Sequence, residues 1–280
     1  MNSTMIDEAT QKTLRAAYNP DGSDLRRHQL VMLDMLIWLD RLCVRHAIPY
    51  WLSSGTLLGA VRHGGFIPWD DDVDIELMLP DYLRLIKAIV QEAPAAGYAL
   101  QTSDTDPEFL FPFAKLRDTH TNIAEADGLD SLQAFHGAYI DIFPLAPSAS
   151  RRLHRLGSKL IGTELKMRVA RPGLRRCMAP LRFALKHIAY PVLRLLSAAG
   201  AGATHRHLIP SYFSAPRIAG ECLPTGRISF EGHTFGAPHS PDLYLRRLFG
   251  DNYTSLPSTI HTHLATDSNT PASPRLFHLR

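Results

Sequence analysis

Long apolar runs are missing from this 280-residue sequence. No stretch reaches the roughly 18 consecutive apolar residues that mark a membrane-spanning helix. The closest approach, residues 181–201, is interrupted by arginine, lysine and histidine. The first 24 residues hold no apolar segment behind a basic start, so we expect no signal peptide. These absences predict a cytoplasmic protein.

Cysteine is also scarce. Cys43, Cys177 and Cys222 are odd in number and far apart in the sequence. Their spacing is that of neither a disulfide framework nor a paired-cysteine zinc site. We therefore expect small buried apolar residues in a reducing compartment.

Net charge is low, at +3, but it is divided unevenly along the chain. Residues 1–150 hold 11 basic and 21 acidic side chains, whereas residues 151–194 hold 12 basic and one acidic. Phe183 and Tyr190 are the aromatic residues of this basic stretch, too few for base stacking, so no nucleic-acid partner is expected. Its mixture of apolar and basic residues predicts peripheral contact with the anionic inner face of a membrane. The alternative is that its charges are the solvated faces of packed helices.

Helix and strand patterns are intermixed. Apolar residues at helical spacing predict a long helix over residues 25–47, which Pro49 should end. Alternating apolar residues predict a strand over residues 67–79. Residues 151–200 look mainly helical. Other helices are expected at 57–62, 81–93 and 242–249, and other strands at 50–52, 98–102, 112–117 and 138–143. This mixture predicts an α/β (α+β) fold.

An acidic segment interrupts the strand pattern. Asp70, Asp71, Asp72 and Asp74 put four carboxylates within five residues, where they repel one another. On a strand, Asp70, Asp72 and Asp74 would point to one face. Such hard oxygen ligands indicate a divalent cation, Mg²⁺ or Mn²⁺. An EF-hand is excluded because its sixth position would be Ile75, where glycine is required.

A turn of small residues precedes the acidic segment. Ser54, Gly55 and Thr56 lie between an expected strand and an expected helix, where backbone N–H groups bind phosphate oxygens. Together with a metal-binding strand, this turn indicates a phosphate-plus-metal site. Arg62 and His63 follow the turn and would neutralise a diphosphate there, or else be solvated loop charges.

Two later strands carry residues that suit the same site. Asp141 is a lone carboxylate in an apolar strand, which usually needs a metal, a cation or a proton to transfer. Lys115 and Arg117 place two cations on one strand face, suited to binding phosphate. The alternative for these two is surface charge on an edge strand.

Residues 49–75 read PYWLSSGTLLGAVRHGGFIPWDDDVDI, which closely resembles the signature of the LicD family. That family includes bacterial phosphocholine transferases and is related to fukutin-type ribitol-phosphate transferases. The likeness extends over roughly residues 25–257, through KLRD at 115–118, IDIFPL at 140–145 and FGDNY at 249–253.

The resemblance implies a nucleotidyltransferase-like mixed sheet with flanking helices and an added basic helical region. Residues 1–24 would be an N-terminal extension and residues 25–150 the catalytic core. Residues 151–254 would hold the basic helical region and the C-terminal part of the same domain, and residues 255–280 a flexible tail. Family members move a phosphorylated alcohol from a CDP-linked donor, such as CDP-choline, to a sugar hydroxyl of a glycan or lipid-linked glycan and release CMP.

The resemblance also implies roles for individual residues. Asp72 and Asp74 would be paired metal ligands with Asp70 as a supporting carboxylate. Asp141 would be a third carboxylate, either another ligand or the base that accepts the sugar proton. Ser54, Gly55 and Thr56 would hold the donor phosphates.

Two other enzyme classes share parts of this pattern. A glycosyltransferase also holds a metal ion and a nucleotide diphosphate with Asp-x-Asp at a strand end, and a true nucleotidyltransferase releases pyrophosphate. The small-residue turn before the acidic strand favours the phosphotransferase over the glycosyltransferase.

Overall fold

The computed structural model describes residues 5–123, 133–170, 173 and 177–257. Within these ranges the centre is a seven-stranded mixed sheet in the order β1-β2-β5-β4-β3, with β6 beside β5 and β7 beside β6. The parallel neighbours are β2 and β5, and the other neighbouring pairs are antiparallel. The strands are β1 (Trp51–Leu52), β2 (Asp74–Met78), β3 (Tyr98–Gln101), β4 (Ala114–Asp118), β5 (Tyr139–Pro147), β6 (Thr204–His207) and β7 (Arg217–Ile218). The mixed α/β class predicted from the sequence is confirmed.

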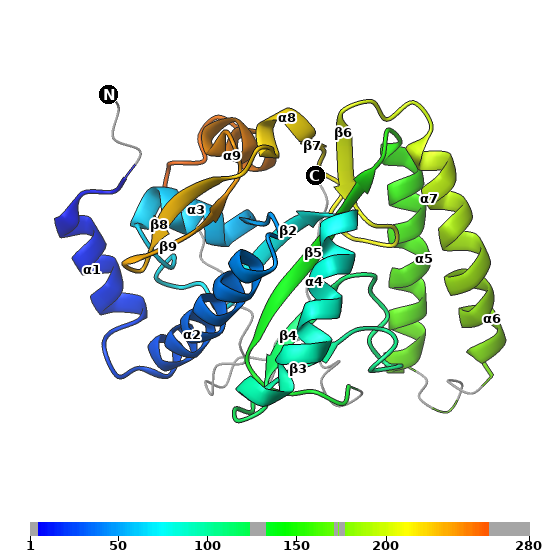
Figure 1. The fold of residues 1–280 in the computed structure, drawn as a ribbon, viewed down its shortest axis with the longest axis horizontal. Helices are drawn as coiled ribbons and strands as arrows, with labels where there is room; N and C mark the ends of the chain where they lie inside the picture. Colours follow the sequence, from blue (N-terminus) through cyan, green and yellow to red (C-terminus); the bar gives the residue numbers. More distant parts are fainter. Residues whose placement is uncertain (1–4, 124–132, 171–172, 174–176, 258–280) are drawn as a thin grey trace.

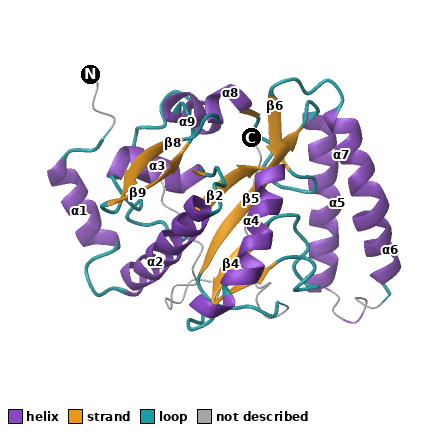
Figure 2. Ribbon diagram, viewed as in Figure 1, coloured by secondary structure: helices purple, strands orange, loops and turns teal. Residues whose placement is uncertain are grey.

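Helices flank this sheet, and a separate hairpin packs beside it (Figures 1 and 2). The hairpin strands are β8 (Gly226–Phe230) and β9 (His233–Ala237). The helices are α1 (Glu8–Tyr18), α2 (Asp24–Arg45), α3 (Ser54–His63), α4 (Leu79–Glu92), η1 (Pro94–Ala96), α5 (Arg151–Ala170), α6 (Ala179–Ala184), η4 (Leu185–Ala189, a π-helical turn), α7 (Tyr190–Ala198), α8 (Ala219–Cys222) and α9 (Pro241–Phe249). None of the helices in the described ranges is both long and apolar enough to cross a membrane.

Helix α2 covers one face of the sheet. It begins after Ser23, whose side chain accepts a hydrogen bond from the Arg26 N–H and so caps the helix. Its apolar face, including Met32, Leu36 and Leu39, is fully buried in the main core. The predicted helix over residues 25–47 is therefore confirmed to within two residues at its C-terminal end.

Strand β2 is shorter than the predicted strand over residues 67–79. Residues 70–73 are not paired in a strand, and Leu79 already begins α4. Pro80 explains the second boundary, because proline suits the first turn of a helix and lacks the N–H that a strand ladder uses. Three of the four clustered aspartates thus precede the strand and only Asp74 is part of it.

The alternative for Lys115 and Arg117, surface charge on an edge strand, is excluded. Both lie on β4, which is enclosed by β3 and β5 and is buried along its whole length. Cys43 and Cys222 are buried as predicted, whereas Cys177 is exposed. Most of the predicted tail, residues 258–280, lies outside the described residues.

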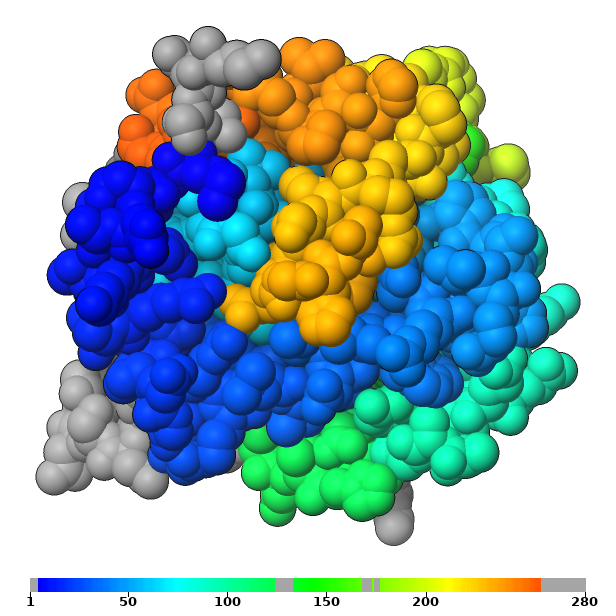
Figure 3. Space-filling model, turned by 60° about the vertical axis from the view of Figure 1, so that its left-hand side comes forward, coloured from blue at the N-terminus to red at the C-terminus, as the bar shows by residue number. Residues whose placement is uncertain are grey.

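The hairpin β8–β9 and helix α1 stand on either side of α3. In the space-filling view of Figure 3, α3 is visible in cyan between the blue N-terminal segment and the yellow-orange hairpin. Glu231 at the hairpin turn joins these parts. Its carboxylate pairs with Arg26 of α2 at 2.7 Å and Arg15 of α1 at 3.3 Å and accepts the Phe66 N–H at 3.1 Å.

Candidate functional site

Three neighbouring strands bring the predicted acidic and basic residues together. In the parallel pair of β2 and β5, Asp74 lies in register with Asp141. In the antiparallel pair of β5 and β4, Asp141 lies opposite Lys115. The Lys115 Nζ is 3.2 Å from the Asp141 Oδ1, and both side chains are at most 13% exposed. Residues separated by tens of positions in the sequence therefore meet on one face of the sheet.

The acidic segment before β2 is held in place by α2. Gln29 donates from Nε2 to the Asp70 carbonyl at 2.8 Å, and His28 donates from Nε2 to the Asp71 carbonyl at 3.0 Å. Both donors are buried, and burial is the main reason why the pKa of His28 is lowered. We did not predict a role for either residue. The available signal was a pair of polar residues on the otherwise apolar face of α2.

Carboxylates crowd around Asp74. Burial raises its pKa well above the usual range, and the neighbouring charges of Asp72, Asp141 and Asp70 raise it further. Among the described residues, no three His, Cys, Asp or Glu side chains already stand in coordinating geometry. The donor set itself, hard carboxylate oxygens that repel one another, matches the chemistry of Mg²⁺ or Mn²⁺ ligands. A shared cation would relieve this repulsion once the side chains turned toward it.

The first turn of α3 lies against the acidic segment. A Cβ added to Gly55 would come 2.8 Å from the Asp70 Oδ2, so glycine lets the carboxylate approach the helix backbone. Ser54 has a positive φ of 47° at the start of this turn. Thr56 is buried, and its hydroxyl accepts the Asp74 N–H at 2.9 Å. The turn predicted to bind phosphate and the strand predicted to bind a metal ion are therefore joined by a hydrogen bond. The Thr56 side chain that makes this bond faces the interior.

Arg62 and His63 lie at the other end of α3. Eight steps of about 1.5 Å separate Arg62 from Ser54, or about 12 Å along the helix. Arg62 is buried and donates to the carbonyls of Tyr253, at 3.3 Å, and Ser255, at 2.9 Å. Burial and the adjacent Arg62 lower the pKa of His63 to about 3, which keeps it neutral. Arg62 thus holds the C-terminal segment, whereas His63 contacts Gln11 of α1 at 2.6 Å; that the two residues neutralise a diphosphate stays a prediction.

Lys115 and Arg117 share one strand face but differ in their contacts. The Lys115 Nζ lies 3.3 Å from the centre of the Tyr139 ring as well as beside Asp141. Arg117 is almost fully buried and donates to the Gln101 side chain at 2.7 Å and to the Gly137 carbonyl at 2.9 Å. Lys115 is therefore part of the carboxylate cluster, whereas Arg117 stabilises the sheet next to it.

A second buried carboxylate, Glu76, lies two residues after Asp74 on the same strand. Arg217 pairs with it at 2.6 Å, and His207, Tyr244 and Trp51 donate to it at 2.6, 2.7 and 3.3 Å. Burial raises the pKa of Glu76, but Arg217 and His207 lower it by more, so the net shift is downward. Glu76 is thus a permanently charged, fully paired group.

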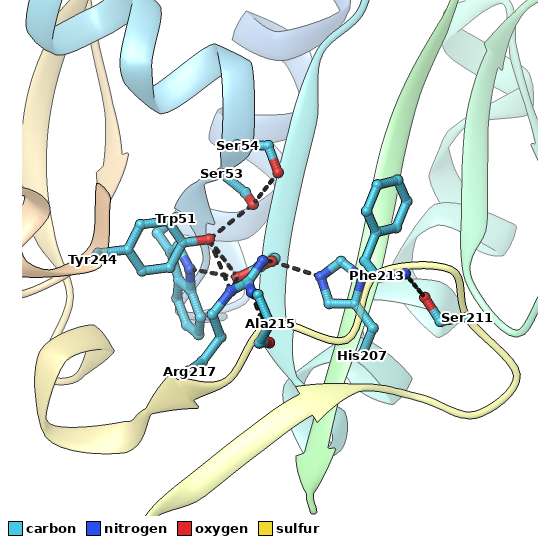
Figure 4. Close-up of polar contacts among 10 residues, drawn as sticks. Trp51, Ser53, Ser54, His207, Ser211, Phe213, Ala215, Arg217 and Tyr244 are labelled. Carbon is cyan, nitrogen blue, oxygen red and sulfur yellow. Dashed lines mark hydrogen bonds and ion pairs between the residues drawn. The ribbon is translucent and has the colours of Figure 1, made fainter. Parts of the chain in front are cut away.

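This cluster reaches the first turn of α3 through Tyr244. Its hydroxyl donates to Glu76 and lies 2.9 Å from the Ser53 Oγ, which in turn lies 3.2 Å from the Ser54 Oγ (Figure 4). The Ser53 N–H also donates to the Asp74 carbonyl at 3.0 Å. Helix α9, far away in the sequence, therefore fixes the position of the small-residue turn.

Aromatic rings extend the same sheet face beyond the carboxylates. Phe143, two residues after Asp141, stacks on His207 with ring centres 4.6 Å apart. Phe113, two residues before Lys115, packs on Phe143 at 4.6 Å. Phe213, which is 44% exposed, meets Phe143 at 5.8 Å. This aromatic cluster was not predicted, because its members come from three separate segments.

Comparison with known proteins supports the interpretation of this site. Residues 47–154 match the model of the LicD/FKTN/FKRP nucleotidyltransferase domain. Over 120 residues the chain is 39% identical to the lipopolysaccharide cholinephosphotransferase LicD of Haemophilus influenzae. This alignment covers 42% of this chain and 43% of that protein. Over 34 residues it is 59% identical to human ribitol 5-phosphate transferase FKRP, covering 12% of this chain and 7% of that protein. Over 46 residues it is 48% identical to mouse ribitol-5-phosphate transferase FKTN, covering 16% and 10% respectively.

The aligned segments span less than half the length of each of these relatives. The family model's match, residues 47–154, contains β1 to β5 and helix α3. The resemblance seen in the sequence is therefore confirmed for this part: residues 47–154 are similar to the nucleotidyltransferase domain of the LicD/FKTN/FKRP family.

Proposed function

We propose that this protein is a metal-dependent transferase. It moves a phosphorylated alcohol from a CDP-linked donor to a sugar hydroxyl of a glycan or lipid-linked glycan and releases CMP. The observation that carries the proposal is the register that sets Asp74 beside Asp141 and Asp141 opposite Lys115, next to the first turn of α3. The names of the relatives, a cholinephosphotransferase and two ribitol-phosphate transferases, support this reaction class.

The carboxylates Asp70, Asp72 and Asp74 would hold Mg²⁺, or Mn²⁺ in its place, with Asp141 beside them as the base. A bound ion supplies positive charge that stabilises the diphosphate and the departing CMP. The raised pKa of Asp74, caused by burial and by its acidic neighbours, supports this assignment because a cation would reverse both effects.

The remaining chemistry falls to the side chains of the chain itself. The acceptor hydroxyl oxygen attacks the phosphorus that carries the alcohol, the bond from that phosphorus to the CMP oxygen breaks, and the hydroxyl proton passes to an Asp141 carboxylate oxygen. Lys115 keeps Asp141 in position and adds positive charge beside the transferred phosphate. The backbone N–H groups at Ser54 and Gly55 bind donor phosphate oxygens at the start of α3.

The aromatic cluster supports phosphocholine as the transferred group. A quaternary ammonium ion binds favourably over aromatic faces, whereas the hydroxyls of ribitol need hydrogen-bonding partners. Phe143 and Phe113 lie two positions along the chain from Asp141 and Lys115, and Phe213 packs on Phe143 with ring centres 5.8 Å apart. We therefore expect CDP-choline to be a better donor than CDP-ribitol.

A product assay tests the proposal. The purified chain is incubated with MgCl₂, a panel of sugar acceptors and, in turn, CDP-choline, CDP-ribitol, CDP-glycerol, UDP-glucose, GDP-mannose and the nucleoside triphosphate CTP. Release of CMP together with a phosphorylated sugar is the expected result. Release of UDP or GDP would instead indicate a glycosyltransferase, and pyrophosphate a nucleotidyltransferase; either product would overturn the proposal.

The variant Asp74→Asn tests the site, with Asp104→Asn as a matched control whose side chain is 85% exposed. Asp74→Asn should abolish CMP release while Asp104→Asn keeps it. In a thermal melt, MgCl₂ should raise the melting temperature of the wild type and the control but not that of Asp74→Asn. Normal turnover by Asp74→Asn would refute the assignment.

A further inference from the structure

Helix α7 and the π-helical turn before it expose large apolar side chains. The exposed fractions are 60% for Ile188, 48% for Val192, 75% for Leu195 and 56% for Leu196. Their spacing, i, i+4, i+7 and i+8, places them on one side of the helix. We call these four residues the outer stripe.

The opposite side of α7 is already used for packing. Tyr190 and Leu193 are buried with Ile209, and Leu153 and Leu160 of α5 pack against them. A helix that is apolar on both sides is normally buried on both sides. The outer stripe therefore contributes little to the core of the described chain, and an exposed apolar surface of this kind marks a site of interaction.

The neighbouring helix extends this apolar surface. In α6, which leads through η4 into α7, Leu181 is 49% exposed and Phe183 is 62% exposed. Figure 1 shows α6 and α7 along the edge of the molecule beyond α5, away from the hairpin and α1.

The charges around the outer stripe are mainly positive, although Asp104, which is 85% exposed, pairs with Lys186 of η4 at 2.8 Å. Residues 151–220 contain a single acidic residue, Glu164, which is buried and pairs with Arg182 at 3.2 Å. Helix α5 packs beside α7 and exposes five cations. They are Arg151, Arg152, Arg155, Lys159 and Lys166.

We propose that the outer stripe inserts into the surface of an anionic lipid bilayer, with the α5 cations at the lipid phosphates. Apolar side chains combined with an excess of cations are what an interfacial helix needs to bind anionic lipid. A second copy of the chain fits less well, because two such basic surfaces would repel each other. The inference goes beyond the proposed transferase, since the outer stripe lies outside residues 47–154 and its binding needs no donor or metal ion.

Flotation with vesicles tests this inference on the full chain. Wild-type protein should float with phosphatidylcholine vesicles that contain phosphatidylglycerol and not with phosphatidylcholine alone. Binding should fall as salt rises, because the Debye length shrinks to about 3 Å near 1 M salt. Absence of binding to anionic vesicles at low salt would overturn the proposal.

The double variant Ile188→Gln with Leu195→Gln should weaken binding at least about tenfold, since two apolar side chains no longer enter the interface. The matched control is Val44→Gln with Val90→Gln, two residues that are 64% and 58% exposed on α2 and α4. It should bind like the wild type. The lipid assignment would be refuted if Ile188→Gln with Leu195→Gln bound vesicles as well as the wild type does. It would also be refuted if the wild type were a dimer in gel filtration and this double variant a monomer. Release of CMP with a free sugar as acceptor should be the same in both double variants, so this test and that of the transferase fail independently.

Discussion

Arg217 offers the sharpest test of the energetics around the site. Its guanidinium is 2% exposed and contacts Glu76, whose side chain is fully buried, at 2.6 and 3.2 Å. Arg217→Met keeps much of the side-chain volume but leaves a buried carboxylate without this cation. Breaking a buried pair on one side costs about 3–5 kcal/mol. The matched control, Arg246→Met, removes an ion pair with Asp242 whose side chains are 44% and 52% exposed and should cost at most about 1 kcal/mol.

Urea unfolding followed by circular dichroism measures both free energies. Arg217→Met should unfold at a clearly lower urea concentration than the wild type, and Arg246→Met close to it. The double variant Glu76→Gln with Arg217→Met should recover part of the loss, because the uncompensated charge is gone. The reasoning is refuted if Arg217→Met and Arg246→Met unfold at the same urea midpoint. It is also refuted if the double variant loses as much unfolding free energy as Glu76→Gln and Arg217→Met lose together.

Two further predictions concern the first turn of α3 and a buried histidine. Gly55→Ala should push the Asp70 carboxylate away and lower turnover roughly ten- to hundredfold, with little effect on the free energy of unfolding. The control is Gly220→Ala, because the space around Gly220 is open. Equal kcat/KM values in the two variants would contradict the prediction. His154 is 1% exposed, and burial is the main cause that lowers its pKa to about 4 in the folded chain. Below pH 6.5 the unfolded chain therefore binds more protons than the folded chain. The free energy of unfolding falls for this reason as pH decreases toward 4. From this pKa difference, the free energy of unfolding of His154→Gln, measured with urea, should fall by about 2 kcal/mol less between pH 7 and pH 5 than that of the wild type. The exposed His233→Gln should follow the wild type, and an unchanged pH slope in His154→Gln would count against the assignment.

Local patterns predicted the elements of the core well. Helix α2 and strands β3 and β5 begin within one residue of their predicted starts, because each has a clear apolar period and a polar or proline boundary. The small-residue turn and the acidic segment were also recognisable, since glycine and clustered aspartates are unusual beside apolar strands. These features depend only on neighbours in the sequence.

Contacts between distant segments could not be predicted in this way. The register of Asp74 with Asp141 depends on which strands become neighbours, and the sequence of a single strand does not determine that. The Glu76 cluster is a second case, because His207 and Arg217 come from short strands with no alternating apolar pattern. Arg62 looked like a loop cation for the same reason: its partners belong to the C-terminal segment.

The two acidic residues of β2 show how a structural carboxylate differs from a functional one. Glu76 and Asp74 are two residues apart on one strand, and burial disfavours the charge of both. At Glu76 the fold offsets that cost with Arg217 and three further donors, so its charged form is stabilised by folding alone. At Asp74 the neighbouring charges are also negative and add to the cost. A chain keeps such an arrangement only where something outside the fold compensates for it, and departures from local consistency of this kind are expected at functional sites. This contrast supports the proposal that Asp74 and its acidic neighbours are the functional group, and it does so without reference to any relative.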